Sequence, residues 1–164
     1  MKTYSRSFDL QSKDNPSFTD VTSKIHSAVS ESKIKDGIIV VYSQHTTCSI
    51  IIQEESHDTS IFQNSTLFQD LIDVLENIVP TLKRKNQYLH PGPILIDICA
   101  GFGETLTECH NTDGHLRSMF FGRSESIPLI NGEVMLGDFG QVYFADFDQI
   151  RPRERIFRVQ IIGE

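Results

Sequence analysis

The sequence predicts an α+β domain in which two main helices pack on a mostly antiparallel β-sheet. Short β-branched or alternating segments recur along the chain, whereas only two long stretches show helical periodicity. The pair Asn131-Gly132 between two strand-like segments is a strong hairpin signal, and a hairpin joins antiparallel neighbours. The 164 residues suit one domain, which is long enough to bury about two-thirds of its unfolded surface.

Charge and composition exclude several functional classes. The formal net charge of −7 argues against a general nucleic-acid or anionic-membrane binder, since these need a basic surface. No apolar run approaches the ~20 residues of a membrane span, and the N-terminus lacks the apolar core of a signal peptide. We therefore expect a cytoplasmic protein with no nucleic-acid or membrane partner. The basic clusters Lys83–Lys85 and Arg151–Arg158 are interpreted as solvated surface, the second on an edge strand.

Two stretches place apolar residues on one helical face. The first follows a cap at Thr19 or Asp20, and its apolar residues are Val21, Ile25, Ala28 and Val29. The second ends before Pro80, and its apolar residues are Leu67, Phe68, Leu71, Ile72, Leu75, Ile78 and Val79. Asp73 and Glu76 lie on the opposite face, where solvation explains them more simply than a metal. A short helix is also expected at Leu116–Phe121.

Alternating or β-branched segments predict the strands. Turn residues such as Asp36-Gly37 bound them, and the polar segment Gln11–Ser17 is expected as a loop. The expected strands are Thr3–Leu10, Ile38–Tyr42, Ser49–Gln53, Ile94–Cys99, Ser126–Ile130, Glu133–Gly137, Gln141–Asp148 and Ile156–Ile162.

Two polar segments that contain a histidine interrupt the apolar pattern. The first, Ser43–Cys48, separates two apolar strands, and packing alone would not require a histidine and two threonines there. The second, Asn111–Arg117, lies shortly before Gly122-Arg123-Ser124 and the hairpin strands. Asn, Asp, Arg, Ser and His beside a sheet are typical of a small anion or metal site, although such residues also form ordinary turns. We expect the two segments to share one site.

These motifs resemble the YjbQ family, whose members are described as secondary thiamine-phosphate synthases. The family pattern His-Thr-(Thr/Ser)-Ala, followed after a strand by Asn-Glu, is similar to His45-Thr46-Thr47-Cys48 and then Gln53-Glu54. Gly114-His115-Leu116-Arg117 and Gly122-Arg123-Ser124 match two further motifs in the same order. The resemblance covers nearly the whole chain and implies a single YjbQ-like domain over residues 1–164.

The sequence departs from the family pattern in three ways. Gly137-Asp138-Phe139-Gly140 replaces the Gly-Thr-Trp-Gln signature, so the contribution of Thr, Trp and Gln is missing. Cys48 replaces an alanine, and Gln53 replaces an asparagine. About twenty extra residues follow Tyr88-Leu89-His90, which indicates an insertion or lid at about 91–109. The three cysteines are odd in number and lack the pair spacing of a metal or redox motif.

The histidines are the expected metal ligands. The resemblance implies this role for His45 and His115, and its shorter Tyr-x-His pattern adds His90. Neutral imidazole is a common nitrogen ligand of zinc, and three protein ligands plus water form an open, catalytic-type zinc position. We therefore expect a divalent metal, zinc by preference, at these three residues. Two alternatives stay open: His110 in place of His90, or histidines that hydrogen-bond around an anion without metal.

The remaining candidates would serve a phosphorylated substrate. Thr46, Thr47 and Ser124 offer hydroxyl groups, and Arg117 offers the planar fork that binds phosphate in a bidentate way. Glu54 matches the family's Asn-Glu and is a candidate catalytic residue with His45 and His115, because a carboxylate can orient a ligating histidine or act as a general base.

Three functions follow from these residues and the resemblance. The resemblance implies a transferase that joins a pyrimidine diphosphate to a thiazole phosphate and releases pyrophosphate. The alternatives are a metal-dependent phosphohydrolase and a non-catalytic protein that binds a metal or a phosphorylated metabolite. The resemblance also implies a homotrimer, and Phe144, Phe147 and Phe157 are the apolar edge-strand residues expected to be buried between subunits.

Overall fold

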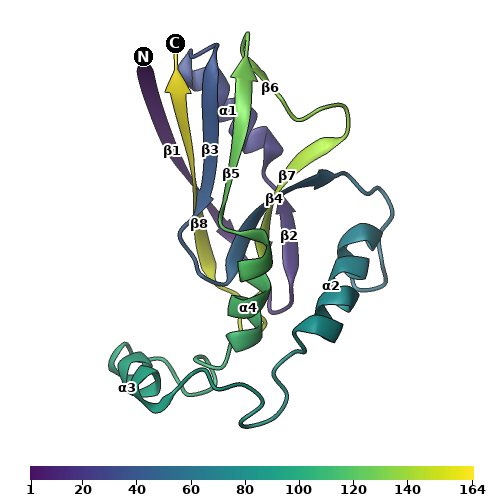
Figure 1. The fold of residues 1–164 in the computed structure, drawn as a ribbon, viewed down its shortest axis with the longest axis vertical. Coiled ribbons are helices and arrows are strands. Elements are labelled where there is room, and N and C mark those ends of the chain that lie inside the picture. Colours follow the sequence, from purple (N-terminus) through teal and green to yellow (C-terminus); the bar gives the residue numbers. More distant parts are fainter.

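The computed structural model describes residues 1–164 and contains two antiparallel sheets and four helices. The larger sheet has the strand order β1-β8-β3-β5-β6 and the smaller one the order β2-β7-β4 (Figure 1). The strands are β1 (Lys2–Gln11), β2 (Ser17–Asp20), β3 (Gly37–Ser43), β4 (Cys48–Glu54), β5 (Ser124–Ile130), β6 (Glu133–Val134), β7 (Gly140–Asp146) and β8 (Glu154–Gly163). The helices are α1 (Thr22–Ser32), α2 (Thr66–Ile78), α3 (Pro93–Gly101) and α4 (Thr112–Phe121). The predicted α+β class is confirmed.

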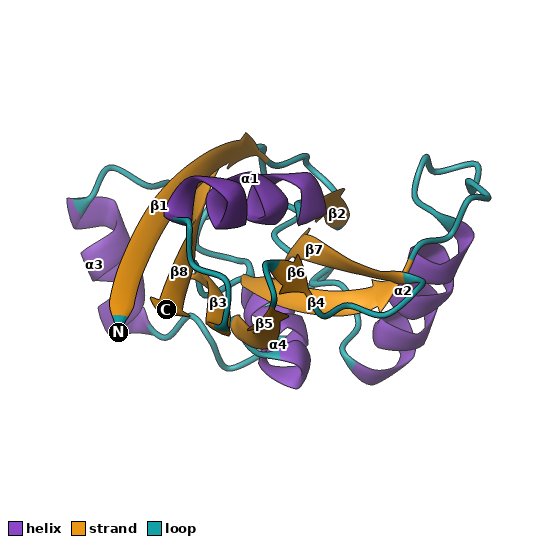
Figure 2. Cartoon of the chain, turned by 90° about the horizontal axis from the view of Figure 1, so that it is seen from above, coloured by secondary structure: helices purple, strands orange, loops and turns teal.

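The main core lies between α1 and the strands. Helix α1 buries the predicted stripe, Val21, Ile25, Ala28 and Val29, against side chains from β3, β4, β5, β7 and β8. Figure 2 shows β7 and β4 lying between α1 and α4. The apolar stripe is therefore buried against the sheet, as its spacing predicted, because burying its one apolar face stabilises such a helix.

A second, smaller core covers the other face of β7. Alternate residues of this strand point to opposite faces, so Val142 and Phe144 join the main core while Ala145 packs with α2 and α4. Leu71 and Leu75 of α2 and Phe121 of α4 meet there. Because both faces of β7 are covered, Val142 to Asp146 form a continuous buried run.

The predicted hairpin is confirmed in register and in turn geometry. Ile130 pairs with Glu133 across the Asn131-Gly132 turn. Both turn residues have positive φ, 53° and 82°, which a tight two-residue turn of the type favoured in hairpins requires. Strand β6 is shorter than expected and ends at Val134.

Three local expectations are wrong. Ile94–Cys99 lies in helix α3 and not in a strand; Pro93 sits at the first helical turn, where its missing N–H costs nothing. Strand β2 occupies the end of the expected Gln11–Ser17 loop and the expected cap positions Thr19 and Asp20. Asp20 still caps locally, since its Oδ1 accepts a hydrogen bond from the Thr22 N–H at 2.8 Å.

Two expectations that depend on strand position are also wrong. Strand β8, which carries most of Arg151–Arg158, is not an edge strand but lies between β1 and β3. Phe144, Phe147 and Phe157 are at most 1% exposed in the single chain, so they offer no surface to a partner subunit.

No helix combines the length and apolar character needed to cross a membrane.

Candidate functional site

A buried ionic cluster lies where β7 ends and β8 begins. The guanidinium of Arg155 donates from Nε to Asp146 Oδ2 at 2.6 Å and from Nη2 to Asp146 Oδ1 at 3.2 Å. Nη2 also lies 3.4 Å from Asp148 Oδ2 and donates to Thr47 Oγ1 at 3.1 Å. We call these three charged residues the Asp146–Arg155–Asp148 cluster. Its members are almost fully buried, so the fork-shaped pairing compensates charges that would otherwise be costly.

The alternation of apolar residues along β8 indicated that Arg155 is buried, but the many charges between Arg151 and Arg158 suggested an exposed segment. Arg155 shares the inward face of β8 with Phe157, Val159 and Ile161, because residues two apart in a strand point the same way. The interpretation of Arg151–Arg158 as solvated surface is therefore wrong for Arg155. The alternation places a cation on the core side of the strand, which indicates a buried partner.

His45 lies beside this cluster, at the turn between β3 and β4. Its Nε2 accepts a hydrogen bond from the Ile156 backbone N–H at 3.0 Å. Burial, and then the nearby positive charge of Arg155, lowers the pKa of His45, while Asp146 acts in the opposite direction. A neutral ring that accepts at Nε2 carries its proton on Nδ1, so its Nε2 lone pair is already used within the chain.

His90 and His115 form a pair of imidazoles at the start of α4. Their ring centroids are 5.4 Å apart and the rings are nearly perpendicular. The Thr112 hydroxyl donates to the His90 carbonyl at 2.6 Å, which fixes the His90 backbone to the first turn of α4. His90 is thus the histidine that accompanies His115, as expected from the Tyr-x-His pattern.

The environment of His115 favours a neutral imidazole. Burial and the neighbouring His90 lower its pKa, whereas the Thr46 backbone, Asp148 and Asp113 oppose this shift. Because the net direction is downward from 6.5, the ring is neutral at pH 7 and is able to accept a proton or bind a cation.

Close packing fixes α4 in place. A Cβ on Gly114 would lie 2.9 Å from the Phe147 carbonyl oxygen, so only glycine lets the helix approach the strand end this closely. The Ser118 hydroxyl donates to the Thr46 carbonyl at 2.6 Å, and the Ser49 hydroxyl donates to the Ser118 carbonyl at 3.0 Å. The two polar segments predicted to share a site are therefore joined directly.

The structure gives Arg117 protein partners. Its Nη2 lies 2.7 Å from Glu76 Oε2, and its Nε and Nη2 both donate to the Val79 carbonyl, at 3.1 and 2.8 Å. The side chain is 1% exposed. Burial alone would raise the pKa of Glu76, but hydrogen bonds from Thr81, Lys83 and Arg117 lower it to about 2. Arg117 thus joins α4 to the end of α2, and Glu76 is not merely a solvated acid.

The other predicted residues are distributed over the molecule. Thr47 is buried and serves Arg155, while Thr46 and Ser124 are exposed. Glu54 is exposed at the far end of β4, six residue steps or roughly 20 Å from the His45 end at about 3.3 Å per residue. Within one chain Thr47 contacts Arg155, His45 contacts the neighbouring Ile156, and His90 lies beside His115. Glu54 lies apart from them.

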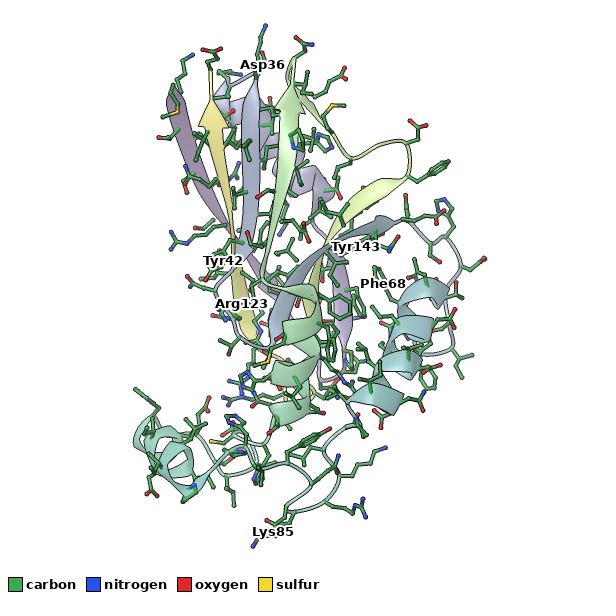
Figure 3. All side chains as sticks on the ribbon, viewed as in Figure 1. Asp36, Tyr42, Phe68, Lys85, Arg123 and Tyr143 are labelled. Atoms are coloured by element: carbon green, nitrogen blue, oxygen red, sulfur yellow. The ribbon has the colours of Figure 1, made fainter.

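Arg123 is an exposed cation near the His45 turn that forms a hydrogen bond but no ion pair. Its Nη1 is 3.4 Å from the Gln44 carbonyl, and its guanidinium carbon is 5.8 Å from the centre of the Tyr42 ring. Figure 3 shows Arg123 and Tyr42 close together where α4 meets the larger sheet. The sequence motif Gly122-Arg123-Ser124 was recognised, but a binding role was assigned to Ser124 and not to Arg123.

The three histidines do not gather around one point in the single chain. The only group of three metal-binding side chains whose ligand atoms all lie within 4.8 Å of one another is Cys99, Glu104 and Cys109. Cys99 and Cys109 lack the pair spacing of a metal motif in the sequence, but the fold brings their sulfur atoms close together. Burial, the Cys99 thiol and nearby carboxylates raise the pKa of the Cys109 thiol to about 11.

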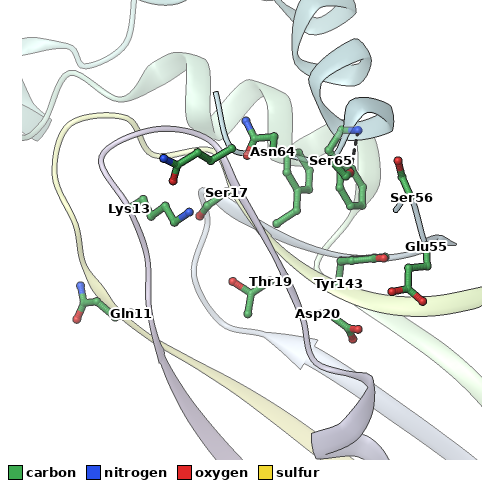
Figure 4. Close-up of a pocket in the computed structure, with 13 residues that line it drawn as sticks. Gln11, Lys13, Ser17, Thr19, Asp20, Glu55, Ser56, Asn64, Ser65 and Tyr143 are labelled. Carbon is green, nitrogen blue, oxygen red and sulfur yellow. Dashed lines mark hydrogen bonds between the residues drawn. The ribbon is translucent and has the colours of Figure 1, made fainter. Parts of the chain in front are cut away.

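A polar groove of about 410 Å³ lies elsewhere, between β2 and α2 (Figure 4). Phe18, Phe68 and Tyr143 form its apolar wall, with Phe68 and Tyr143 in edge-to-face contact at 4.6 Å. Burial, Asp20 and Glu55 raise the pKa of Tyr143. None of the predicted site residues lines this groove.

Comparison with known proteins identifies the family. A sequence profile described as "UPF0047 protein YjbQ-like" matches residues 6–164. A UPF0047 protein of Methanocaldococcus jannaschii is 32% identical over 157 residues, which cover 96% of this chain and 93% of the relative. The chain belongs to the YjbQ family. A UPF0047 protein of Methanothermobacter thermautotrophicus is 29% identical over 164 residues, covering 100% of this chain and 95% of the relative.

Solved YjbQ structures share the fold. An uncharacterised YjbQ/UPF0047 protein from Clostridium acetobutylicum matches with a TM-score of 0.72 and 25% identity, covering 96% of this chain and 99% of that one. A protein of unknown function from Sulfolobus solfataricus, also with a TM-score of 0.72 but 21% identical, covers 99% of this chain and all of that one. The second likeness supports the YjbQ fold alone.

Proposed function

We propose that this YjbQ-family protein is an enzyme that acts on phosphorylated small molecules at the His90–His115 pair. The observation that carries the proposal is the neutral, half-buried His115 ring on α4, a helix packed closely against the sheet. Its ring centroid lies 5.4 Å from that of His90. A group positioned on rigid elements, with a pKa moved by its surroundings, has the character of a general acid or base.

The surrounding groups suit a phosphorylated substrate. His90, Thr46 and Arg123 are exposed and available to a ligand, whereas Arg117 and Arg155 are engaged by carboxylates and carbonyls. In our proposal Arg123 therefore takes the anion-binding role first assigned to Arg117. Thr46 and the nearby Ser124 add hydroxyl donors.

The family resemblance suggests a transfer reaction for this site. In thiamine-phosphate synthesis the ring nitrogen of a thiazole phosphate attacks the methylene carbon of a pyrimidine diphosphate, and the carbon–oxygen bond to the diphosphate breaks. Arg123 and the hydroxyl donors would stabilise the charge that develops on the leaving pyrophosphate. Transfer requires no water, so a phosphohydrolase would differ by releasing inorganic phosphate from a single substrate.

Zinc at the histidines remains a prediction. His45, His90 and His115 do not gather in one chain, and His45 Nε2 is engaged by a backbone N–H. The residues therefore do not fit a three-histidine zinc centre within one chain, and no step above depends on a metal.

A substrate screen with matched variants tests the proposal. Purified protein is incubated with phosphorylated metabolites, including the pyrimidine diphosphate and thiazole phosphate pair, while pyrophosphate and inorganic phosphate are measured. We expect turnover that falls at least a hundredfold in His115→Asn and is unchanged in His26→Asn, an exposed histidine of α1. Saturable binding without turnover would instead favour the non-catalytic function. Equal turnover in the two variants would remove His115 from the mechanism.

A further inference from the structure

The insertion contains a second cluster of side chains that the proposed function does not use. Cys99 ends the last turn of α3, and Glu104 and Cys109 follow at intervals of five residues. Their ligand atoms all lie within 4.8 Å of one another. In a tetrahedral zinc site with zinc–sulfur bonds of about 2.3 Å, two sulfurs lie roughly 3.8 Å apart, so side chains already this close need only small movements to hold one ion. We propose that Cys99, Glu104 and Cys109 form a zinc-binding site that stabilises the insertion.

Two backbone turns bring these residues together. The Glu104 N–H donates to the Cys99 carbonyl at 3.0 Å and closes the end of α3. Thr105 then begins a turn in which its N–H donates to Glu108 Oε2 at 2.6 Å and its carbonyl accepts from the Cys109 N–H at 3.3 Å. The cluster is therefore formed by local hydrogen bonds that do not depend on a metal.

Glu104 is oriented for ligation by two arginines. Its Oε1 accepts from Arg151 Nη2 at 3.2 Å and from Arg153 Nη1 at 3.1 Å. Its other oxygen, Oε2, faces Cys109 Sγ at 3.9 Å. One carboxylate oxygen is thus fixed by hydrogen bonds while the other points to the thiols, an arrangement that commonly supports metal ligands.

The charges around the cluster suit a divalent, thiophilic cation. Two thiolates and one carboxylate would give the zinc-loaded site one net negative charge, which Arg151 and Arg153 offset. Thiolate ligands select zinc over magnesium or calcium, which prefer oxygen. Cys99 and Glu104 are half-buried and Cys109 is buried, so an ion can enter from the solvent side and a water can complete four ligands.

The position of the insertion gives this site a structural consequence. The chain enters the insertion directly after His90 and leaves it shortly before Thr112, whose hydroxyl donates to the His90 carbonyl. Helix α3 has no buried residue of its own and lies apart from the two sheets in Figure 1. A zinc ion that links the end of α3 to residue 109 would therefore stabilise the insertion, which has little apolar packing of its own.

Cobalt titration of the full chain tests the proposal. Reduced protein, stripped of metal by a chelator, is titrated with Co²⁺ under anaerobic conditions. We expect one equivalent to produce the near-ultraviolet sulfur-to-cobalt charge-transfer band, and Zn²⁺ to abolish it. Cys99→Ser and Cys109→Ser should each weaken binding at least a hundredfold, and Glu104→Gln about tenfold. Cys48→Ala, which removes the cysteine outside the cluster, should leave the band unchanged.

Two further measurements test the zinc site without relying on the folding of the cysteine variants or on the proposed enzyme activity. In the unmodified protein, Zn²⁺ should slow alkylation of Cys99 and Cys109, measured for each cysteine by mass spectrometry. His115→Asn should retain the cobalt band, so failure of the proposed enzyme would not affect this result. Absence of a sulfur-to-cobalt band at equimolar metal, or a band that survives both serine substitutions, would overturn the proposal.

Discussion

Arg117 of α4 and Glu76 of α2 form an ion pair with 2.7 Å between Nη2 and Oε2. The same guanidinium donates to the Val79 carbonyl, so one side chain joins the end of α2 to the helix that carries His115. A residue expected to bind substrate is thus engaged in joining two helices.

Replacing Arg117 should therefore reduce stability more than it affects ligand binding. Arg117→Ala should lower the free energy of unfolding by about 3 kcal/mol, because a buried carbonyl and a carboxylate lose their partner. Arg117→Lys should recover only part of the loss, since one ammonium cannot reproduce the fork. Urea unfolding measures both, with the exposed Arg123→Ala as a control expected within about 0.5 kcal/mol of the unmodified protein. Unchanged stability in Arg117→Ala would contradict this role.

Gly114→Ala should destabilise the packing of α4. The new Cβ would meet the Phe147 carbonyl oxygen at 2.9 Å, and backbone atoms on both sides cannot yield easily. We expect a loss of about 2 kcal/mol, typical of overpacking. Gly101→Ala is the matched control, because no atom lies within 4 Å of its added Cβ. Equal unfolding temperatures for the two variants would show that the close contact between Gly114 and the Phe147 carbonyl does not affect stability.

Stability should decrease as the pH falls below neutrality. The pKa values of His45 and His115 are lower in the folded chain than their ordinary value of 6.5, so the unfolded state binds more protons in this range. The stabilisation is complete above 6.5 and is lost as the pH falls through the folded values. Urea unfolding between pH 5 and 8 measures this, and His115→Asn should flatten the slope. A slope of opposite sign in the unmodified protein would contradict the environment described for these rings.

We also predict that the chain assembles as a homotrimer, as its family resemblance implies. Because the predicted contact residues on β7 and β8 are buried in the monomer, the interface must use other apolar side chains. Met119 and Phe120 of α4 are 75% and 60% exposed and lie on the helix of the candidate site. Sedimentation equilibrium should give three times the chain mass, and Met119→Lys should shift the protein toward monomer. A concentration-independent monomer in the unmodified protein would end this prediction.

Local patterns in the sequence were sufficient for much of the fold. The stripe on α1, the stripe on α2 and the Asn131-Gly132 turn predicted their elements, because each depends on residues that are near one another in the chain. The Ser118–Thr46 hydrogen bond places α4 against the His45 turn, while a site shared by the two segments stays a prediction. Zinc binding, substrate and assembly stay predictions.

Features decided by distant partners required the tertiary structure. The apolar run Ile94–Cys99 is compatible with a strand or a helix, and Pro93 before it suits the first turn of a helix as well as the start of a strand. Arg117 was expected to bind substrate and Arg155 to lie on the surface, and the positions of Glu76 and Asp146 show instead that both are buried and paired. A charge is retained in the interior only where a partner compensates it, and that partner is supplied by the way the whole chain folds.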